Sequence, residues 1–196
     1  MVDDPASDVR TVPEPGWIRL VDRISRVLAG ISAGVVAVLA VHVFVDVTAR
    51  WLANRPLPGT LEYVTFWWMP AVVFLALAGG QLRAEHMKVT LLTDLMTARA
   101  RRIAEVVILL VVAALIVVLT YYLLLGAIES TRIRQAALGV AVVPLWPAKW
   151  AAVVGLAAFL LQTAATLWRV VTGAPTVPHQ VLDDVEPARL TLEPPR

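Results

Sequence analysis

The sequence contains no cysteine, which excludes disulfides, thiolate metal sites and a cysteine nucleophile. Charged residues are also scarce, at 16% of 196 residues, whereas hydrophobic residues make up 59%. A soluble domain of this size could not bury so much apolar surface in its core. The formal net charge of +2 is too small to indicate a nucleic-acid partner. The composition therefore favours an integral membrane protein.

Recognisable catalytic motifs are missing as well. The sequence has no glycine-rich phosphate loop, no HExxH helix and no Ser-His-Asp context. It also lacks paired carboxylates in the middle of an apolar segment, and the broken helices and internal repeats that surround a transporter's midplane site. We therefore expect neither an enzyme nor a chain that transports a substrate alone.

Four long apolar segments stand out in what remains. They show no strand-like alternation, and within lipid an α-helix satisfies its own backbone hydrogen bonds. The shortest has 19 residues and would rise about 28 Å as a helix, close to the thickness of the hydrocarbon core. All seven tryptophans lie at or near segment ends, as in an interfacial aromatic belt. The sequence predicts an all-α integral membrane protein with four transmembrane helices, at 27–45, 63–82, 106–128 and 150–168.

The basic residues predict how these helices are oriented. Twelve of the 17 lie in the two tails and the middle loop, and five lie in the other two loops. Because basic residues concentrate on the cytoplasmic side, we expect both termini and the middle loop to be cytoplasmic. The membrane domain should cover 17–171, between proline-rich flexible tails at 1–16 and 172–196.

The middle loop carries an amphipathic pattern. Apolar residues recur at helical spacing while polar residues point elsewhere; the apolar positions are Met87, Leu91, Leu92, Leu95 and Met96. This pattern is typical of a helix that lies in the membrane interface, here on the cytoplasmic side. The alternative is an ordinary solvated connection.

Polar residues near the outer ends of the first two helices are candidates for partner contacts. His42, Asp46 and Arg50 share one helix face at four-residue spacing, which permits either an ionic ladder against a partner or snorkelling to water. After a loop with two prolines, Thr60 could cap the second helix, and Glu62 lies in its first turn.

Small residues offer a second kind of contact. Gly30 and Gly34 form a small-xxx-small pattern in the first span, and Gly79, Gly80 and Gly155 add further faces on which helices of another protein could pack closely. Proline at position 70 should kink the second span.

A haem site would need His42 and His86 as axial ligands. The predicted topology argues against this pairing, because His42 lies toward the outer side and His86 lies beside Arg83 and Lys88 on the cytoplasmic side. We therefore expect no cofactor.

Four short motifs, in order and in the expected topology, resemble the small membrane subunit of tripartite ATP-independent periplasmic (TRAP) transporters. The resemblance covers about residues 20–171 and rests on VTARW at 47–51, RPLPGTLEY at 55–63, EHMKV at 85–89 and VPLWPAK at 143–149. Some members carry a tryptophan and paired acids after the Pro-x-Pro segment, where this chain has Gly59 and Leu61 and keeps only Glu62.

The resemblance implies a scaffold role in the bacterial cytoplasmic membrane. In such systems a periplasmic protein captures an organic acid, and a large many-helix subunit transports it using the sodium gradient. The small subunit supports this large subunit. The implied partners are these two proteins and the lipid bilayer. Candidate contact residues are Arg50, Glu62, His86, Gly30 and Gly34.

Two other functions stay open from the sequence. One is a membrane anchor or haem-bearing subunit of a respiratory oxidoreductase. The other is a small self-assembling multidrug exporter, which would need an acid in the middle of an early helix, whereas Asp46 lies at a helix end. The sequence does not select the organic acid.

Overall fold

A computed structural model describes residues 15–82 and 97–173. The amphipathic segment predicted around 87–96, His86 and nearly all of both tails lie outside these ranges. The described chain is helical apart from two short connections, and its elements are α1 (Gly16–Ala53), α2 (Thr60–Tyr63), a π-helical turn (Val64–Trp68), α3 (Met69–Leu82), α5 (Ala98–Arg132), β1 (Ala136–Ala137), β2 (Val143–Pro144) and α6 (Trp146–Thr172).

The prediction of four membrane-spanning helices is confirmed. Four helical segments of the described chain are long and apolar enough to cross a membrane, and α2, the π-helical turn and α3 together form the second. The helices extend beyond the predicted spans. α1 has 38 residues and therefore measures about 57 Å, nearly twice the hydrocarbon thickness. The apolar segments mark only the part of each helix that fits the lipid.

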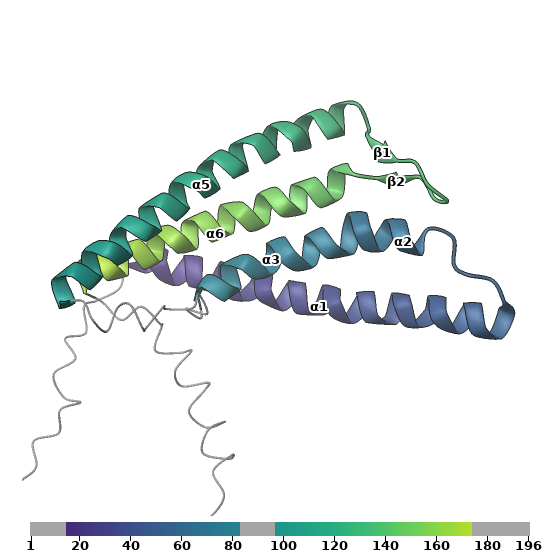
Figure 1. The fold of residues 1–196 in the computed structure, drawn as a ribbon, viewed down its shortest axis with the longest axis horizontal. Helices are drawn as coiled ribbons and strands as arrows, with labels where there is room; N and C mark the ends of the chain where they lie inside the picture. The colour runs from purple at the N-terminus through teal and green to yellow at the C-terminus, as the bar shows by residue number, and fades with distance from the viewer. Residues whose placement is uncertain (1–14, 83–96, 174–196) are drawn as a thin grey trace, which may run out of the picture.

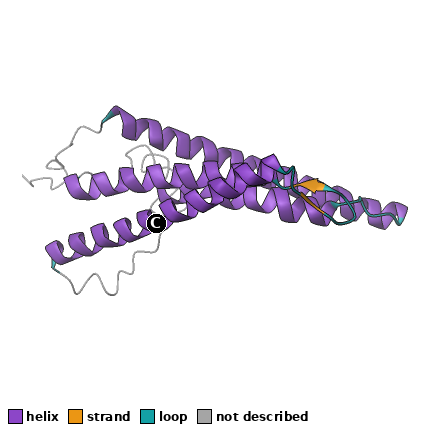
Figure 2. Ribbon diagram, turned by 90° about the horizontal axis from the view of Figure 1, so that it is seen from above, coloured by secondary structure: helices purple, strands orange, loops and turns teal. Residues whose placement is uncertain are grey.

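The four spans form a twisted layer with α6 near its centre. In Figure 1 they lie side by side in the order α5, α6, α3, α1, and α6 contacts all three others. They diverge toward the short loops in Figure 1 and toward the opposite end in the perpendicular view of Figure 2. Half of the most apolar stretch of α6 is buried, against 6–11% in the other three spans.

Two glycines allow the helices of this layer to approach closely. A Cβ atom at Gly79 of α3 would lie 2.6 Å from the Cβ of Ala29 on α1, and one at Gly155 of α6 would collide with the backbone carbonyl of Phe74 on α3. Gly79 and Gly155 therefore serve contacts within the chain. Their predicted use by another protein's helices is wrong.

The connection between α1 and α2 is built from turn residues. Asn54 ends α1 in the left-handed conformation with φ 51°, and Gly59 with φ 85° is the N-cap of α2. The predicted cap at Thr60 is wrong, because the Thr60 hydroxyl instead donates to the carbonyl of Leu57 at 3.3 Å. Pro70 lies in the first turn of α3, directly after the π-helical turn. A proline has no N–H and its ring clashes with the preceding turn, so the irregularity falls where the kink was predicted.

A small β-hairpin, which the sequence did not predict, joins α5 to α6. Strands β1 and β2 are antiparallel, with Ala136 opposite Pro144 and Ala137 opposite Val143. This hairpin and loop 54–59 lie at the same end of the layer, which we call the hairpin end. The opposite end, where α1 and α5 begin and α3 and α6 stop, we call the tail end.

Candidate functional site at the two ends of the helix layer

Asp46 organises the hairpin end of α1. Its carboxylate accepts hydrogen bonds from the backbone amide of Leu57 at 2.8 Å and from Nη2 of Arg50 at 3.0 Å. Asp46 is buried, whereas the Arg50 side chain is 64% exposed. The acid thus fixes loop 54–59 to the helix end, and Arg50 keeps most of its surface open to solvent or to a partner.

The predicted ladder on α1 is only half present. Asp46 and Arg50 form the ion pair of this ladder. His42 does not join it, because its Nδ1 instead accepts a hydrogen bond from Nε1 of Trp68 at 3.2 Å. The His42 ring also lies edge-on to the Trp68 ring, with centroids 6.3 Å apart. His42 thus joins α1 to the π-helical turn. Because Nδ1 accepts this bond, the neutral imidazole carries its proton on Nε2 and neither nitrogen offers a free lone pair to an iron, which disfavours a haem ligand at this position.

Glu62 binds the hairpin tip. Its Oε1 accepts a hydrogen bond from the backbone amide of Val140 at 2.7 Å. The space is tight, since a Cβ atom at Gly139 would collide with the Glu62 carboxylate, and one at Gly59 would collide with the Cβ of Ala141. Two segments almost 80 residues apart in the sequence are thereby held in one surface at the hairpin end.

This surface exposes an apolar tip. Leu138, Val140 and Val142 are 90%, 82% and 66% exposed, and all three belong to the five-residue turn between β1 and β2. Nε1 of Trp67 donates to the carbonyl of Pro144 at 2.8 Å, which fixes the base of the hairpin to the second span. Exposed apolar groups on an anchored turn form a surface that lipid or a partner protein would cover.

A buried polar cluster joins α1 to α6 at the tail end. Nη2 of Arg169 donates to Oδ2 of Asp22 at 2.6 Å, with side-chain exposures of 0% and 5%. Nε2 of Gln162 donates to Oδ1 of Asp22 at 3.0 Å, and the hydroxyl of Ser25 donates to Oε1 of Gln162 at 2.9 Å. An ion pair this deeply buried needs such supporting hydrogen bonds to offset its desolvation.

Single basic residues tie α5 to α6 at each end. At the tail end, Arg102 of α5 donates from Nε to the carbonyl of Val170 at 3.0 Å and from Nη2 to that of Val171, near the C-terminus of α6. A cation is favourable there because the last carbonyls carry partial negative charge. At the hairpin end, Nζ of Lys149 donates to Oε1 of Gln135 at 2.8 Å and to the carbonyl of Gly126 at 3.4 Å.

The remaining candidates are glycines on α1. Gly30 and Gly34 are exposed, and a Cβ atom built at either would meet nothing within 4 Å. Neither glycine is needed for packing within the described chain, so both are available to an outside group. His86 lies outside the described residues.

The tail-end cluster escaped the sequence analysis. Asp22 lies before the first predicted span at 27–45 and Arg169 directly after the fourth at 150–168, whereas the helices continue through both. Spacing could have pointed to them: Asp22 and Ser25 are three apart, and Gln162 and Arg169 are seven apart, so each pair shares one helix face.

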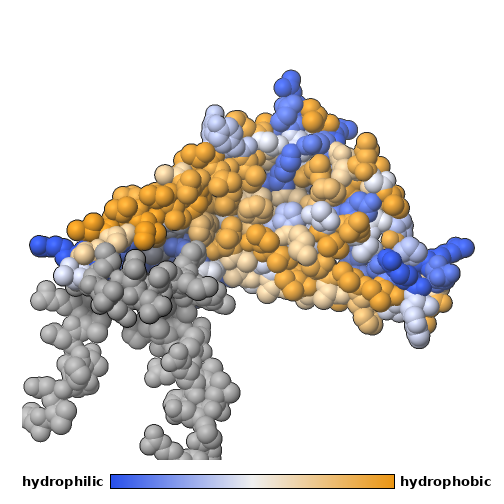
Figure 3. All heavy atoms as spheres, in the orientation of Figure 1, coloured by the Kyte–Doolittle hydropathy of each residue, from blue (hydrophilic) through white to orange (hydrophobic). Residues whose placement is uncertain are grey.

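The described polar groups form contacts within the chain. Within residues 15–82 and 97–173, no group of three or more histidines and acids could hold a metal ion. The polar clusters described above join helices and loops to one another, and apolar surface covers much of the face seen in Figure 3. Four apolar spans tied to one another at both ends define a multi-pass membrane protein.

The comparisons with known proteins identify the family. Residues 39–173 match the family described as "Tripartite ATP-independent periplasmic transporters, DctQ component". No curated protein and no solved structure matches the chain. The chain belongs to this family and is the small membrane subunit of a TRAP transporter. It is a multi-pass protein of the inner membrane.

Proposed function

We propose that this chain is the non-catalytic scaffold of a sodium-driven importer that takes an organic acid from a periplasmic binding protein. Its partners are a large multi-helix subunit, which moves the substrate, and that binding protein. Both termini face the cytoplasm, so the hairpin end is periplasmic.

The observation that carries this proposal is where the polar groups lie. The described ion pairs and most side-chain hydrogen bonds gather near the two ends of the layer, while the apolar segments of all four spans contain no acid, lysine or arginine. A charged substrate or a coupling ion would need polar partners at membrane depth. A layer whose apolar segments carry no charged side chain is suited to support another protein.

The groups at the surface of the layer, with Glu62 half-buried among them, suggest which parts meet which partner. Arg50, Glu62 and the apolar hairpin tip lie at the hairpin end, where a periplasmic protein and the outer loops of the large subunit would meet this chain. The faces of α1 and α5 at the two edges of the layer remain for membrane contacts, because each has one flank without a neighbouring span.

Reconstitution tests the proposal. Liposomes would hold this chain, the large subunit, or both, with a candidate binding protein, labelled organic acids and an inward sodium gradient. We expect uptake only with both membrane subunits, and its loss when the gradient is collapsed. Gradient-dependent uptake by this chain and the binding protein without the large subunit would refute the scaffold role. If uptake by the complete system does not depend on the sodium gradient, only the assignment of sodium as the coupling ion is refuted.

A double variant tests the periplasmic surface. Arg50→Ala together with Glu62→Ala removes the exposed cation and frees the hairpin tip, so we expect weaker uptake and weaker recovery of the complex. Arg132→Ala is the matched control, because Arg132 is also an arginine near the hairpin end and its side chain is 81% exposed. Full uptake by the double variant would mean that these residues only support the local structure.

A further inference from the structure

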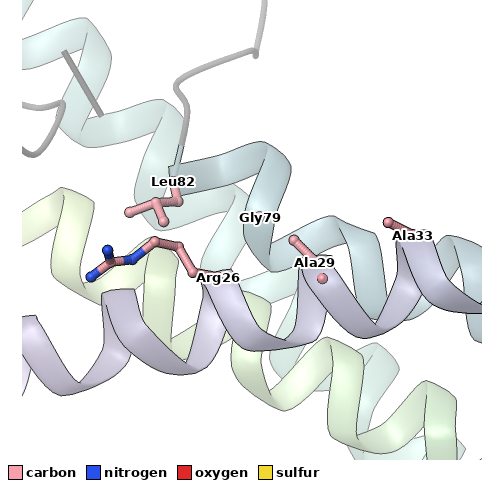
Figure 4. Close-up of a pocket in the computed structure, with 6 residues that line it drawn as sticks. Arg26, Ala29, Ala33, Gly79 and Leu82 are labelled. Atoms are coloured by element: carbon pink, nitrogen blue, oxygen red, sulfur yellow. The ribbon is translucent and has the colours of Figure 1, made fainter. Parts of the chain in front are cut away.

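A groove between α1 and α3 opens near the tail end. It has a volume of about 280 Å³ and is lined by Arg26, Ala29, Gly30, Ala33, Gly79 and Leu82. Figure 4 shows the Arg26 side chain at one end of the groove and Ala29 and Ala33 farther along α1. The walls formed by described residues are mostly small and apolar, and the one charged group among them is the Arg26 guanidinium.

Arg26 is the last of three arginines on one stripe of α1. Arg19, Arg23 and Arg26 follow at i, i+4 and i+7, and all three are exposed. In the described part of the chain, Arg26 makes one long hydrogen bond, from Nε to the carbonyl of Asp22 at 3.4 Å, which leaves its terminal nitrogens available. No described carboxylate forms an ion pair with the three.

Among the described residues, the acid nearest in sequence to Arg23 and Arg26 already has other partners. The Asp22 carboxylate is buried and accepts hydrogen bonds from Arg169 and Gln162, on the α6 side of the helix. The stripe therefore keeps a positive charge directly beside an apolar groove. Arg26 directly precedes the predicted span at 27–45, and the seven residues of helix from Arg26 to Ala33 rise about 10 Å, so we expect the groove to run from headgroup level into the hydrocarbon.

We propose that this groove binds one anionic phospholipid. The phosphate accepts hydrogen bonds from Arg26 and Arg23, and one acyl chain lies along Ala29, Gly30 and Ala33. Arginine suits a phosphate because its planar fork donates two parallel hydrogen bonds. Basic pockets between transmembrane helices on the cytoplasmic side bind anionic headgroups for the same reason. A partner helix in the groove would instead leave these positive charges without an anion.

Native mass spectrometry of the full chain in a neutral detergent tests this proposal. The probes are phosphatidylglycerol, phosphatidylcholine with the same acyl chains, and inorganic phosphate. We expect retention of one phosphatidylglycerol, with little phosphatidylcholine and no stable phosphate adduct. Arg23→Gln and Arg26→Gln should each weaken retention about five-fold, the loss typical of one basic residue near an anionic membrane surface.

A glycine pair provides the matched control for the groove. Gly30→Leu places a side chain in it, and Gly80→Leu adds the same group on α3 outside the lining; neither added Cβ would meet an atom within 4 Å. We expect Gly30→Leu to lose the lipid and Gly80→Leu to keep it.

Three results would overturn the proposal. Equal retention of phosphatidylcholine would show general bilayer contact. Unchanged retention of phosphatidylglycerol by Gly30→Leu would show that the arginines bind the headgroup while the acyl chain does not occupy the groove. If the complex with the large subunit carries no lipid here and Gly30→Leu blocks its formation, the occupant is a helix of that subunit. None of these results depends on whether the complex transports an organic acid.

Discussion

The buried pair between Asp22 and Arg169 gives a quantitative test of the structure. Asp22→Asn keeps the shape of the side chain but removes its charge, so the Arg169 guanidinium, with 0% exposure, loses its ion pair with Asp22. Breaking one half of a buried ion pair costs about 3 kcal/mol or more. For a chain of this size, 3 kcal/mol corresponds to a fall in melting temperature of roughly 6–12 °C. The assay is thermal unfolding of the full chain in detergent, followed by size-exclusion chromatography.

The exposed pair at the other end of α1 is the control. Arg50→Gln breaks a pair whose arginine is 64% exposed, and we expect a loss below about 1 kcal/mol. The double variant Asp22→Leu, Arg169→Leu removes both charges and should recover much of the stability, since apolar residues can replace a buried pair. If Asp22→Asn melts within about 2 °C of Arg50→Gln, the tail-end pair is solvated and the cluster does not hold α1 to α6.

Three further predictions concern orientation and packing. A cysteine at Arg55 should react with a membrane-impermeant thiol reagent in intact cells and one at Arg99 should not; the reverse pattern would invert the topology. Gly155→Ala should lower the melting temperature strongly because its Cβ would collide with the Phe74 carbonyl, and unchanged melting would disprove that contact. Glu62→Gln should speed trypsin cleavage near the hairpin by weakening the bond to the Val140 amide, and equal cleavage rates would show that this bond does not hold the tip.

Apolar segment length was enough to predict the four spans, because a helix is the structure that satisfies the backbone in lipid. The same argument missed the helix ends. α1 begins at Gly16 and passes through Asp22, since a polar side chain that finds a buried partner no longer ends a span. A hydropathy value depends on the residue itself, so it counts the charge of Asp22 but not the buried partner Arg169 that compensates this charge.

The site was less predictable than the fold because its contacts are long-range. Glu62 was placed in a first helical turn from local pattern alone, and this is confirmed, but its bond to Val140 needs the layer to bring loop and hairpin together. Gly30 and Gly155 looked alike in the sequence. The structure separates them, because Gly155 lies against α3 and Gly30 faces open space.

The central place of α6 has a consequence for how the protein is made. Synthesis runs from α1 to α6, so the helix with half of its apolar stretch buried is the last of these four spans to enter the membrane. Until then α5 lacks its main neighbour, and Asp22 lacks both Arg169 and Gln162. Membrane insertion of the first three spans therefore precedes assembly, and folding of the layer is completed after translation of residue 169. A ribosome that stalls before Trp146 would release a chain of loosely associated helices, which membrane proteases could recognise by its unpaired polar groups.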